Sequence, residues 1–216
     1  MNIAILGGTG KEGAGLGARW ALAGHSIVIG SRDAARAHAK AIELRQATRR
    51  LPIVGHDNAE AARLGEVVVI ALPHAGLAAT LPEAREGCRG KVVVSTVVPL
   101  TFGAPRLFTP PAAGSSAEEV QALLPEAHVV AAFHHIAAHE LAATDHAIDC
   151  DLLICGDPSA KATVAELGRS VGLRVIDVGP LTNAGPLEGI TAVLATINRR
   201  YKLKGSGFKI TGLDNA

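Results

Sequence analysis

Short apolar runs alternate with longer amphipathic segments along almost the whole chain. The apolar runs predict strands at residues 3–6, 27–29, 53–54, 67–72, 92–95, 129–133, 152–155 and 175–178. Successive positions within each run are apolar, so we expect helices to cover both faces of the sheet. Strands that alternate with helices in this way are typical of an α/β fold. We predict a Rossmann-type, doubly wound, mostly parallel sheet with a small C-terminal extension.

The amphipathic segments predict the covering helices. These lie at residues 11–23, 34–48, 76–86, 117–124, 159–171 and 187–200, with a further short helical piece after Phe133. Gly24 follows the first helix and is expected to end it. Ser115 and Ser116 each precede a glutamate by three residues, which makes two alternative capping boxes for the fourth helix.

This pattern predicts two units. Residues 1–136 are expected to form the larger, Rossmann-type domain, and residues 137–216 a smaller α/β unit that packs on the same sheet. Residues 101–114 interrupt the rhythm, because they contain three prolines and two glycines and show no clear periodicity. Such a segment is either a functional lid or a plain surface excursion, and both interpretations stay open.

A glycine-rich turn directly follows the first predicted strand and opens the first predicted helix. It contains the pattern G-x-G-x-x-G as Gly8, Gly10 and Gly13. In this context the first glycine allows a tight turn, the second lets the backbone approach a pyrophosphate, and the third lets helix and strand pack closely. Free N–H groups at the helix start then face the anion. We predict a dinucleotide site here, which also includes Thr9, Lys11 and Glu12.

The residues after the second strand indicate which dinucleotide is bound. NAD-binding folds usually carry Asp or Glu there, whereas this chain has Ser31 and Arg32, with Arg36 one helical turn further on. A neutral hydroxyl and planar cations suit a 2′-phosphate, and a carboxylate would repel it. This favours NADP. Asp33 is interpreted either as the N-cap of the second helix or as a group that weakens phosphate binding.

The ends of three later strands are mostly apolar, with isolated polar groups. Ligands of open α/β sheets bind outside the carboxyl ends of the strands, so these segments predict a cleft for a flat ring. Its expected lining is Leu72, Pro73, His74, Val98, Pro99, His134, Ile136 and Ala137.

Composition and charge exclude several classes of protein. The formal net charge is +1 at pH 7, so no overall field attracts nucleic acid or a membrane surface. Aromatic residues make up 3% of the chain, too few to stack the bases of a single strand. No apolar run approaches the roughly 20 residues of a membrane helix. Three cysteines, an odd and sparse number, favour a reducing compartment, and we expect a cytoplasmic protein.

Metal-binding and alternative catalytic patterns are weak. His135 and His139 are four residues apart, with Glu140 beside the second, but no third ligand is obvious. We therefore predict no metal site. The single tyrosine, Tyr201, has Gly205 and not lysine four residues later, so the tyrosine–lysine pair of short-chain reductases and epimerases is missing.

Several motifs, in order, resemble the NADPH-dependent reductases of the deazaflavin coenzyme F-420 (F420). The resemblance covers nearly the whole chain. Its motifs are Ile5 to Gly10, Gly30-Ser31-Arg32, Val97-Val98-Pro99, His134-x-Ile136-x-Ala138, Cys155-Gly156-Asp157, Asp177-x-Gly179-Pro180-Leu181 and Leu187-Glu188-x-Ile190-Thr191.

The resemblance implies hydride transfer between NADP(H) and a deazaflavin, both small-molecule cofactors. It implies that Thr9, Ser31, Arg32 and Arg36 hold the NADP phosphates, and that His134, Ile136 and Thr191 lie against the stacked rings. It also implies a homodimer. Two alternatives stay open: an NADPH-dependent FMN, FAD or ferric reductase of the same fold, and a non-catalytic NADP sensor.

Overall fold

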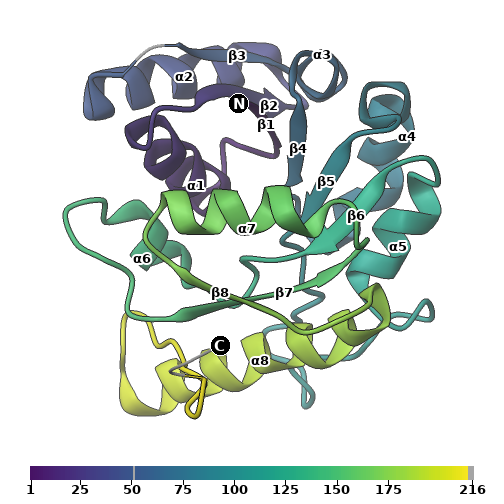
Figure 1. Cartoon of the computed structure of the whole chain (residues 1–216), viewed down its shortest axis with the longest axis vertical. Coiled ribbons are helices and arrows are strands. Elements are labelled where there is room, and N and C mark those ends of the chain that lie inside the picture. Colours follow the sequence, from purple (N-terminus) through teal and green to yellow (C-terminus); the bar gives the residue numbers. More distant parts are fainter. Residues whose placement is uncertain (51, 214–216) are drawn as a thin grey trace.

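The computed structural model describes residues 1–50 and 52–213. Its centre is one eight-stranded sheet with the strand order β3-β2-β1-β4-β5-β6-β7-β8, shown in Figure 1. Neighbouring strands are parallel except for β6 and β7, which are antiparallel. The strands are β1 (Asn2–Leu6), β2 (Ser26–Ser31), β3 (Ile53–Asp57), β4 (Val67–Ile70), β5 (Val92–Ser95), β6 (His128–Ala131), β7 (Asp151–Gly156) and β8 (Arg174–Asp177).

Helices cover both faces of the sheet, so the predicted fold class is confirmed. One face carries α1, α2, α6 and α7, and the other carries α3, α4, α5 and α8. The helices are α1 (Lys11–Leu22), α2 (Ala34–Thr48), α3 (Asn58–Leu64), α4 (Leu77–Cys88), α5 (Ser116–Leu123), α6 (Ala138–Ala142), α7 (Lys161–Ser170) and α8 (Ala184–Tyr201), with single 3-10 turns η1 (His74–Gly76) and η2 (Leu181–Asn183). None of the described helices is long and apolar enough to cross a membrane.

The structure differs from the sequence-based expectation mainly at element ends. Strand β3 runs three residues past Val54, because it pairs with β2 along its whole length. Helix α8 starts at Ala184, three residues before the expected position. Helix α3 was not predicted: it has seven residues, too few for a clear period, and begins where Asp57 accepts a hydrogen bond from the Glu60 N–H at 2.8 Å.

Strands β7 and β8 continue the sheet, and helices α6 and α7 contact α1. The indole N–H of Trp20 donates to the carbonyl of Leu167 on α7 at 3.1 Å. The buried guanidinium of Arg19 donates to the carbonyls of Glu140, Leu141 and Ala143, at 2.6–3.0 Å, so it closes the C-terminal end of α6. These bonds position the connection from β6 to β7 against the first helix.

On the other face, one buried carboxylate joins α8 to α5. Glu188 is 1% exposed and accepts the N–H groups of Ser116 and Ala117 at 3.0 and 3.1 Å. Those N–H groups belong to the free first turn of α5. Of the two alternative capping boxes, the first forms: the N–H of Glu118 donates to the hydroxyl of Ser115 at 3.1 Å.

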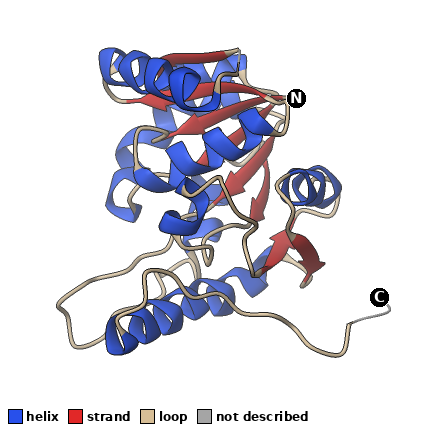
Figure 2. Ribbon diagram, turned by 90° about the vertical axis from the view of Figure 1, so that its left-hand side faces the viewer, coloured by secondary structure: helices blue, strands red, loops and turns tan. Residues whose placement is uncertain are grey.

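The irregular segment 101–114 runs past the start of α8. Leu100 and Phe108 form an isolated antiparallel bridge at its base, and Phe102 at its tip is 74% exposed. The backbone of Gly114 lies so close to Gly185 of α8 that a Cβ there would meet its carbonyl oxygen at 2.8 Å. In Figure 2, α8 and the loops beside it lie beyond one end of the sheet.

Replacing Glu188 tests the contact between α8 and the first turn of α5. We expect Glu188→Ala to lower the free energy of unfolding by about 2–4 kcal/mol, because two buried N–H groups lose their acceptor. Glu188→Gln keeps the shape and one acceptor oxygen and should lose less. Urea unfolding followed by circular dichroism measures both variants, and equal stability of Glu188→Ala and the parent would contradict the assignment.

Candidate functional site

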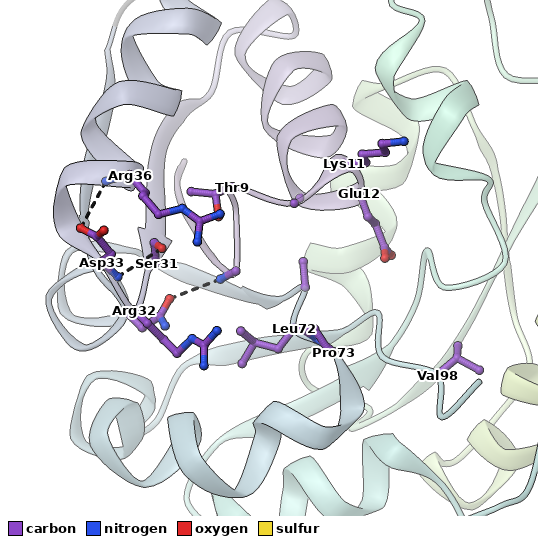
Figure 3. Close-up of a pocket in the computed structure, with 15 residues that line it drawn as sticks. Thr9, Lys11, Glu12, Ser31, Arg32, Asp33, Arg36, Leu72, Pro73 and Val98 are labelled. Carbon is purple, nitrogen blue, oxygen red and sulfur yellow. Dashed lines mark hydrogen bonds between the residues drawn. The ribbon is translucent and has the colours of Figure 1, made fainter. Parts of the chain in front are cut away.

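A cleft of about 720 Å³ opens at the carboxyl ends of β1, β2 and β4. Ligands of doubly wound sheets bind at this edge, where the strand order reverses between β1 and β4. Figure 3 shows the lining residues. They are Gly7, Thr9, Gly10, Lys11, Glu12, Gly13, Ser31, Arg32, Asp33, Arg36, Asn58, Ala71, Leu72, Pro73 and Val98.

The glycine turn forms the floor of the cleft because side chains do not fit there. A Cβ on Gly13 would lie 2.8 Å from the Cα of Gly8, so α1 can approach β1 only without one. Gly8 itself does not line the cleft; its N–H donates to the carbonyls of Ile5 and Gly30 at 3.0 Å. Gly7 has a φ of +77°, a conformation that favours glycine. The cradle is therefore built of backbone, as phosphate binding requires.

Two exposed cations flank one end of the cleft. Arg32 and Arg36 form no ion pair within the described residues, and Figure 3 shows the guanidinium of Arg36 directed toward Thr9. Asp33 is the N-cap of α2, since it accepts the N–H of Ala35 at 2.9 Å. Of its two interpretations, the N-cap is confirmed. The buried hydroxyl of Ser31 accepts the N–H of Asp33 at 3.3 Å, which holds this turn in place.

Sequence reasoning missed Asn58 in the lining. Its side-chain oxygen accepts the N–H of Gly7 at 3.3 Å, and it lies so close to Gly30 that a Cβ there would meet it at 2.9 Å. Asn58 follows β3, whose carboxyl end lies at the same edge as those of β1 and β2. That position was the available signal, but the strand expected from the sequence ended too early to reveal it.

The opposite end of the cleft is apolar apart from one carboxyl group. Val98 lines it, and Figure 3 places Glu12 on the same side, away from the arginines, whereas Leu72 and Pro73 lie between Arg32 and Val98. Burial raises the pKa of Glu12 to about 7, and the hydroxyl of Thr96 beside it lowers the pKa in part. The Oε1 atom of Glu12 is shielded from solvent and has no hydrogen-bond partner.

The residues assigned to the second ring do not line this cleft. His134 and Ile136 are 5% and 4% exposed, and neither they nor Thr191 line the cleft. The hydroxyl of Thr191 donates to the carbonyl of His134 at 3.1 Å, so the structure brings these two together. Ile136 and Ala137 line a separate hollow of about 320 Å³, beside residues 205–207.

A strained turn places His134. Phe133 has a φ of +64°, and the N–H of His134 donates to the carbonyl of Ala132 at 2.9 Å, which is a γ-turn of the rare type. Burial lowers the pKa of His134 to about 3, aided by neighbouring His135; the carbonyls of Ala132 and Leu187 oppose the shift. Neither ring nitrogen has a hydrogen-bond partner. A neutral, unpartnered imidazole at a strained strand end is typical of functional sites.

Two further expected residues lie outside the cleft. The ring of His74 bonds the carboxylate of Glu119 on α5 at 2.5 Å, and Pro99 follows the last lining residue, Val98. Within residues 1–50 and 52–213, no three His, Cys, Asp or Glu side chains are grouped to hold a metal ion. His135 is buried and bonds the carbonyl of Asp151 at 2.9 Å, so it does not face His139 as a helical pair would.

Known proteins of one family are similar to this chain in sequence. The sequence profile of the family "NADP oxidoreductase coenzyme F420-dependent" matches residues 2–99. The chain is 42% identical to an F420-dependent NADP reductase of Methanocaldococcus jannaschii, over 99% of this chain and 100% of that protein. This chain belongs to the coenzyme F420-dependent NADP oxidoreductase family. A protein of the same name from Methanothermobacter marburgensis is 37% identical over 99% of both chains.

A solved structure has the same fold as this chain. The crystal structure of a protein assigned as an F420-dependent NADP reductase, from Arthrobacter sp. FB24, superimposes with a TM-score of 0.84 and 31% identity, over 97% of this chain and 98% of the other. The cofactors of the family are NADP and coenzyme F420, so the resemblance seen in the sequence is confirmed. The cleft fits NADP, since it combines a side-chain-free phosphate cradle with two unpaired guanidinium groups.

The guanidinium of Arg32 is the sharpest test of this fit. We expect Arg32→Ala to weaken NADPH binding by about 1–2 kcal/mol, the scale of one charged hydrogen bond, and to leave NADH binding nearly unchanged. Arg85→Ala removes an exposed arginine of α4 outside the cleft and serves as the control. Fluorescence titration measures the dissociation constants of both cofactors for the parent and the two variants, and equal losses for both cofactors in Arg32→Ala would refute the 2′-phosphate assignment.

Proposed function

We propose that this protein transfers a hydride between NADP(H) and the deazaflavin coenzyme F420 at the Glu12–Val98 end of the cleft. The observation that carries the proposal is the order of groups along the cleft. Unpaired cations come first, then a backbone cradle, then an apolar end. That order matches a dinucleotide with a phosphorylated adenosine at one end and a flat, largely apolar ring at the other.

The chain's task is to bind and orient, because the bound cofactors supply the hydride donor and the hydride acceptor. Arg32, Arg36 and Ser31 hold the 2′-phosphate of NADP, and Gly10 and Thr9 hold its pyrophosphate at the start of α1. The side chain of Val98 then excludes water from the nicotinamide end. Binding NADP in this way fixes the nicotinamide ring so that the deazaflavin ring can meet it face to face.

We assign the deazaflavin side to His134, Ile136 and Thr191. Two observations support this assignment. The ring nitrogens of His134 have no hydrogen-bond partner. The hydroxyl of Thr191 donates to the backbone carbonyl of His134, which holds the two residues together. Because burial keeps His134 neutral at physiological pH, its ring can donate one hydrogen bond and accept another. Ile136 supplies bulk behind the ring. The assignment of Thr191 places the second site partly on the proposed C-terminal unit, residues 137–216.

We further propose a cytoplasmic homodimer. The three cysteines, Cys88, Cys150 and Cys155, are buried and form no disulfide, which fits a reducing compartment. Along α8, Val193, Ile197 and Tyr201 follow one another at intervals of four residues and so share one face. Val193 is 58% and Tyr201 65% exposed. A second copy of the chain would cover this stripe.

The choice of acceptor tests the proposed function directly. We expect the purified protein to bleach the absorbance of oxidised F420 when NADPH is added, and to do so far more slowly with NADH. FMN and FAD should give no comparable turnover. Rapid oxidation of NADPH by FMN or FAD with none by F420 would favour the flavin-reductase alternative, and binding without turnover by any acceptor would favour a sensor.

A pair of isoleucines tests the second ring site. We expect Ile136→Ala to slow hydride transfer in single-turnover experiments by more than about ten-fold while changing the Kd for NADPH little, because ring spacing changes and the dinucleotide contacts do not. Ile53→Ala is the matched control, since Ile53 is buried in β3 and lines neither the cleft nor the hollow beside residues 205–207. Similar transfer rates in the two variants would remove Ile136 from the site.

A further inference from the structure

Glu12 is an acidic side chain where a phosphate cradle would be expected to exclude one. It is the second residue of α1 and lies next to the glycine turn. Its carboxyl group points across the cleft toward the side of Val98, at the opposite end from Arg32 and Arg36. The geometry therefore keeps this negative group away from the phosphates and close to the end that receives the nicotinamide.

The carboxyl group has few partners in the free protein. Its Oε1 atom is shielded from solvent and accepts no hydrogen bond, and no ion pair of the described residues includes it. The neighbouring hydroxyl of Thr96 already donates to the carbonyl of Ile70 at 3.1 Å. Thr96 can satisfy a carboxylate only by leaving that carbonyl. A shielded carboxylate without a cation is costly, so burial favours the protonated form.

The charged and titratable groups of the surrounding elements do not supply the missing cation. They are Lys11 and Arg19 on α1, His74 after β4, His134 after β6, and His139 and Glu140 on α6. Arg19 is occupied by backbone carbonyls, and His74 by Glu119. Glu140 bonds the ring of His146 at 2.8 Å. The side chain of Lys11 is exposed and, in Figure 3, directed away from the carboxyl of Glu12.

We propose that Glu12 senses the redox state of the bound nicotinamide: at neutral pH it is fully ionised beside the positively charged ring of NADP+ and partly protonated beside the neutral ring of NADPH. The inference rests on the proposed function, because it needs the nicotinamide at this end of the cleft. Binding of NADP+ then releases a proton to solvent, and binding of NADPH does not. Rising pH therefore strengthens the binding of NADP+ relative to that of NADPH.

The size of the effect follows from linkage. A carboxyl group with a pKa of about 7 in the free protein is half protonated at neutral pH, so NADP+ should release about half a proton there. If the positive ring keeps Glu12 ionised, the Kd for NADP+ should fall about ten-fold between pH 6 and pH 8. The 2′-phosphate also titrates near this range, but both nucleotides carry it. The difference in pH dependence between the Kd for NADP+ and the Kd for NADPH therefore reports on the nicotinamide ring alone.

Isothermal titration calorimetry in two buffers of different ionisation enthalpy measures the protons released. We expect a difference between NADP+ and NADPH in the parent protein and none in Glu12→Gln. Glu188→Gln should keep the difference: it removes another buried carboxyl group, whose pKa burial raises to about 7, and it lies outside the cleft. The same difference in Glu12→Gln and the parent, or none in the parent, would overturn the inference.

Carbon-13 NMR of glutamate carboxyl groups supplies a second test that needs no variant. The resonance of Glu12 should titrate near pH 7 in the free and NADPH-bound protein, and well below that pH with NADP+. One unchanged midpoint in all three states would overturn the inference while leaving the proposed function intact. Failure of both nucleotides to bind would instead contradict the proposed function.

Discussion

The close approach of α1 to β1 is the contact on which the site depends. Gly8 and Gly13 meet where no Cβ fits, and this brings the free N–H groups of the first helical turn to the edge of the sheet. The same approach positions Glu12 and, further along α1, the buried Arg19 that holds α6. One backbone contact therefore sets the phosphate cradle, one wall of the ring site and the support of the β6–β7 connection.

Charge is distributed unevenly along the cleft, and this asymmetry defines how a ligand must lie. Two unpaired guanidinium groups mark one end, and a shielded carboxyl group marks the other. Between them lie the glycine turn, the polar side chains of Thr9 and Asn58, and the apolar side chains of Leu72 and Pro73. A dinucleotide bound in reverse would place its phosphate beside Glu12 and its uncharged or cationic ring beside the arginines. Both placements cost electrostatic free energy, so the chain selects one orientation without a large binding surface.

Local chemistry explains which features could be predicted from sequence. The glycine spacing, the cations at Arg32 and Arg36, and the buried parallel strands follow from short patterns, and the structure places these groups where expected. Long-range pairings could not be predicted in this way. The bond between Glu188 and the start of α5 joins residues over 70 positions apart, and Asn58 enters the cleft from a short helix that periodicity does not reveal.

The burial of Glu12 is a further example. Sequence placed it in the dinucleotide site, but a carboxyl group at a helix start is ordinarily solvated and favourable there. The raised pKa comes from its tertiary surroundings, which shield one oxygen and leave Thr96 as its polar neighbour. The strained turn at Phe133, which sets the place of His134, is equally a product of the assembled fold.

The preference of the unmodified protein for NADPH over NADH tests the central claim most directly. Both constants should be measured by titration at neutral pH and one fixed salt concentration. If unpaired guanidinium groups hold the 2′-phosphate, NADPH should bind at least about ten-fold more tightly, which corresponds to about 1.4 kcal/mol. Equal dissociation constants for the two nucleotides would contradict the account.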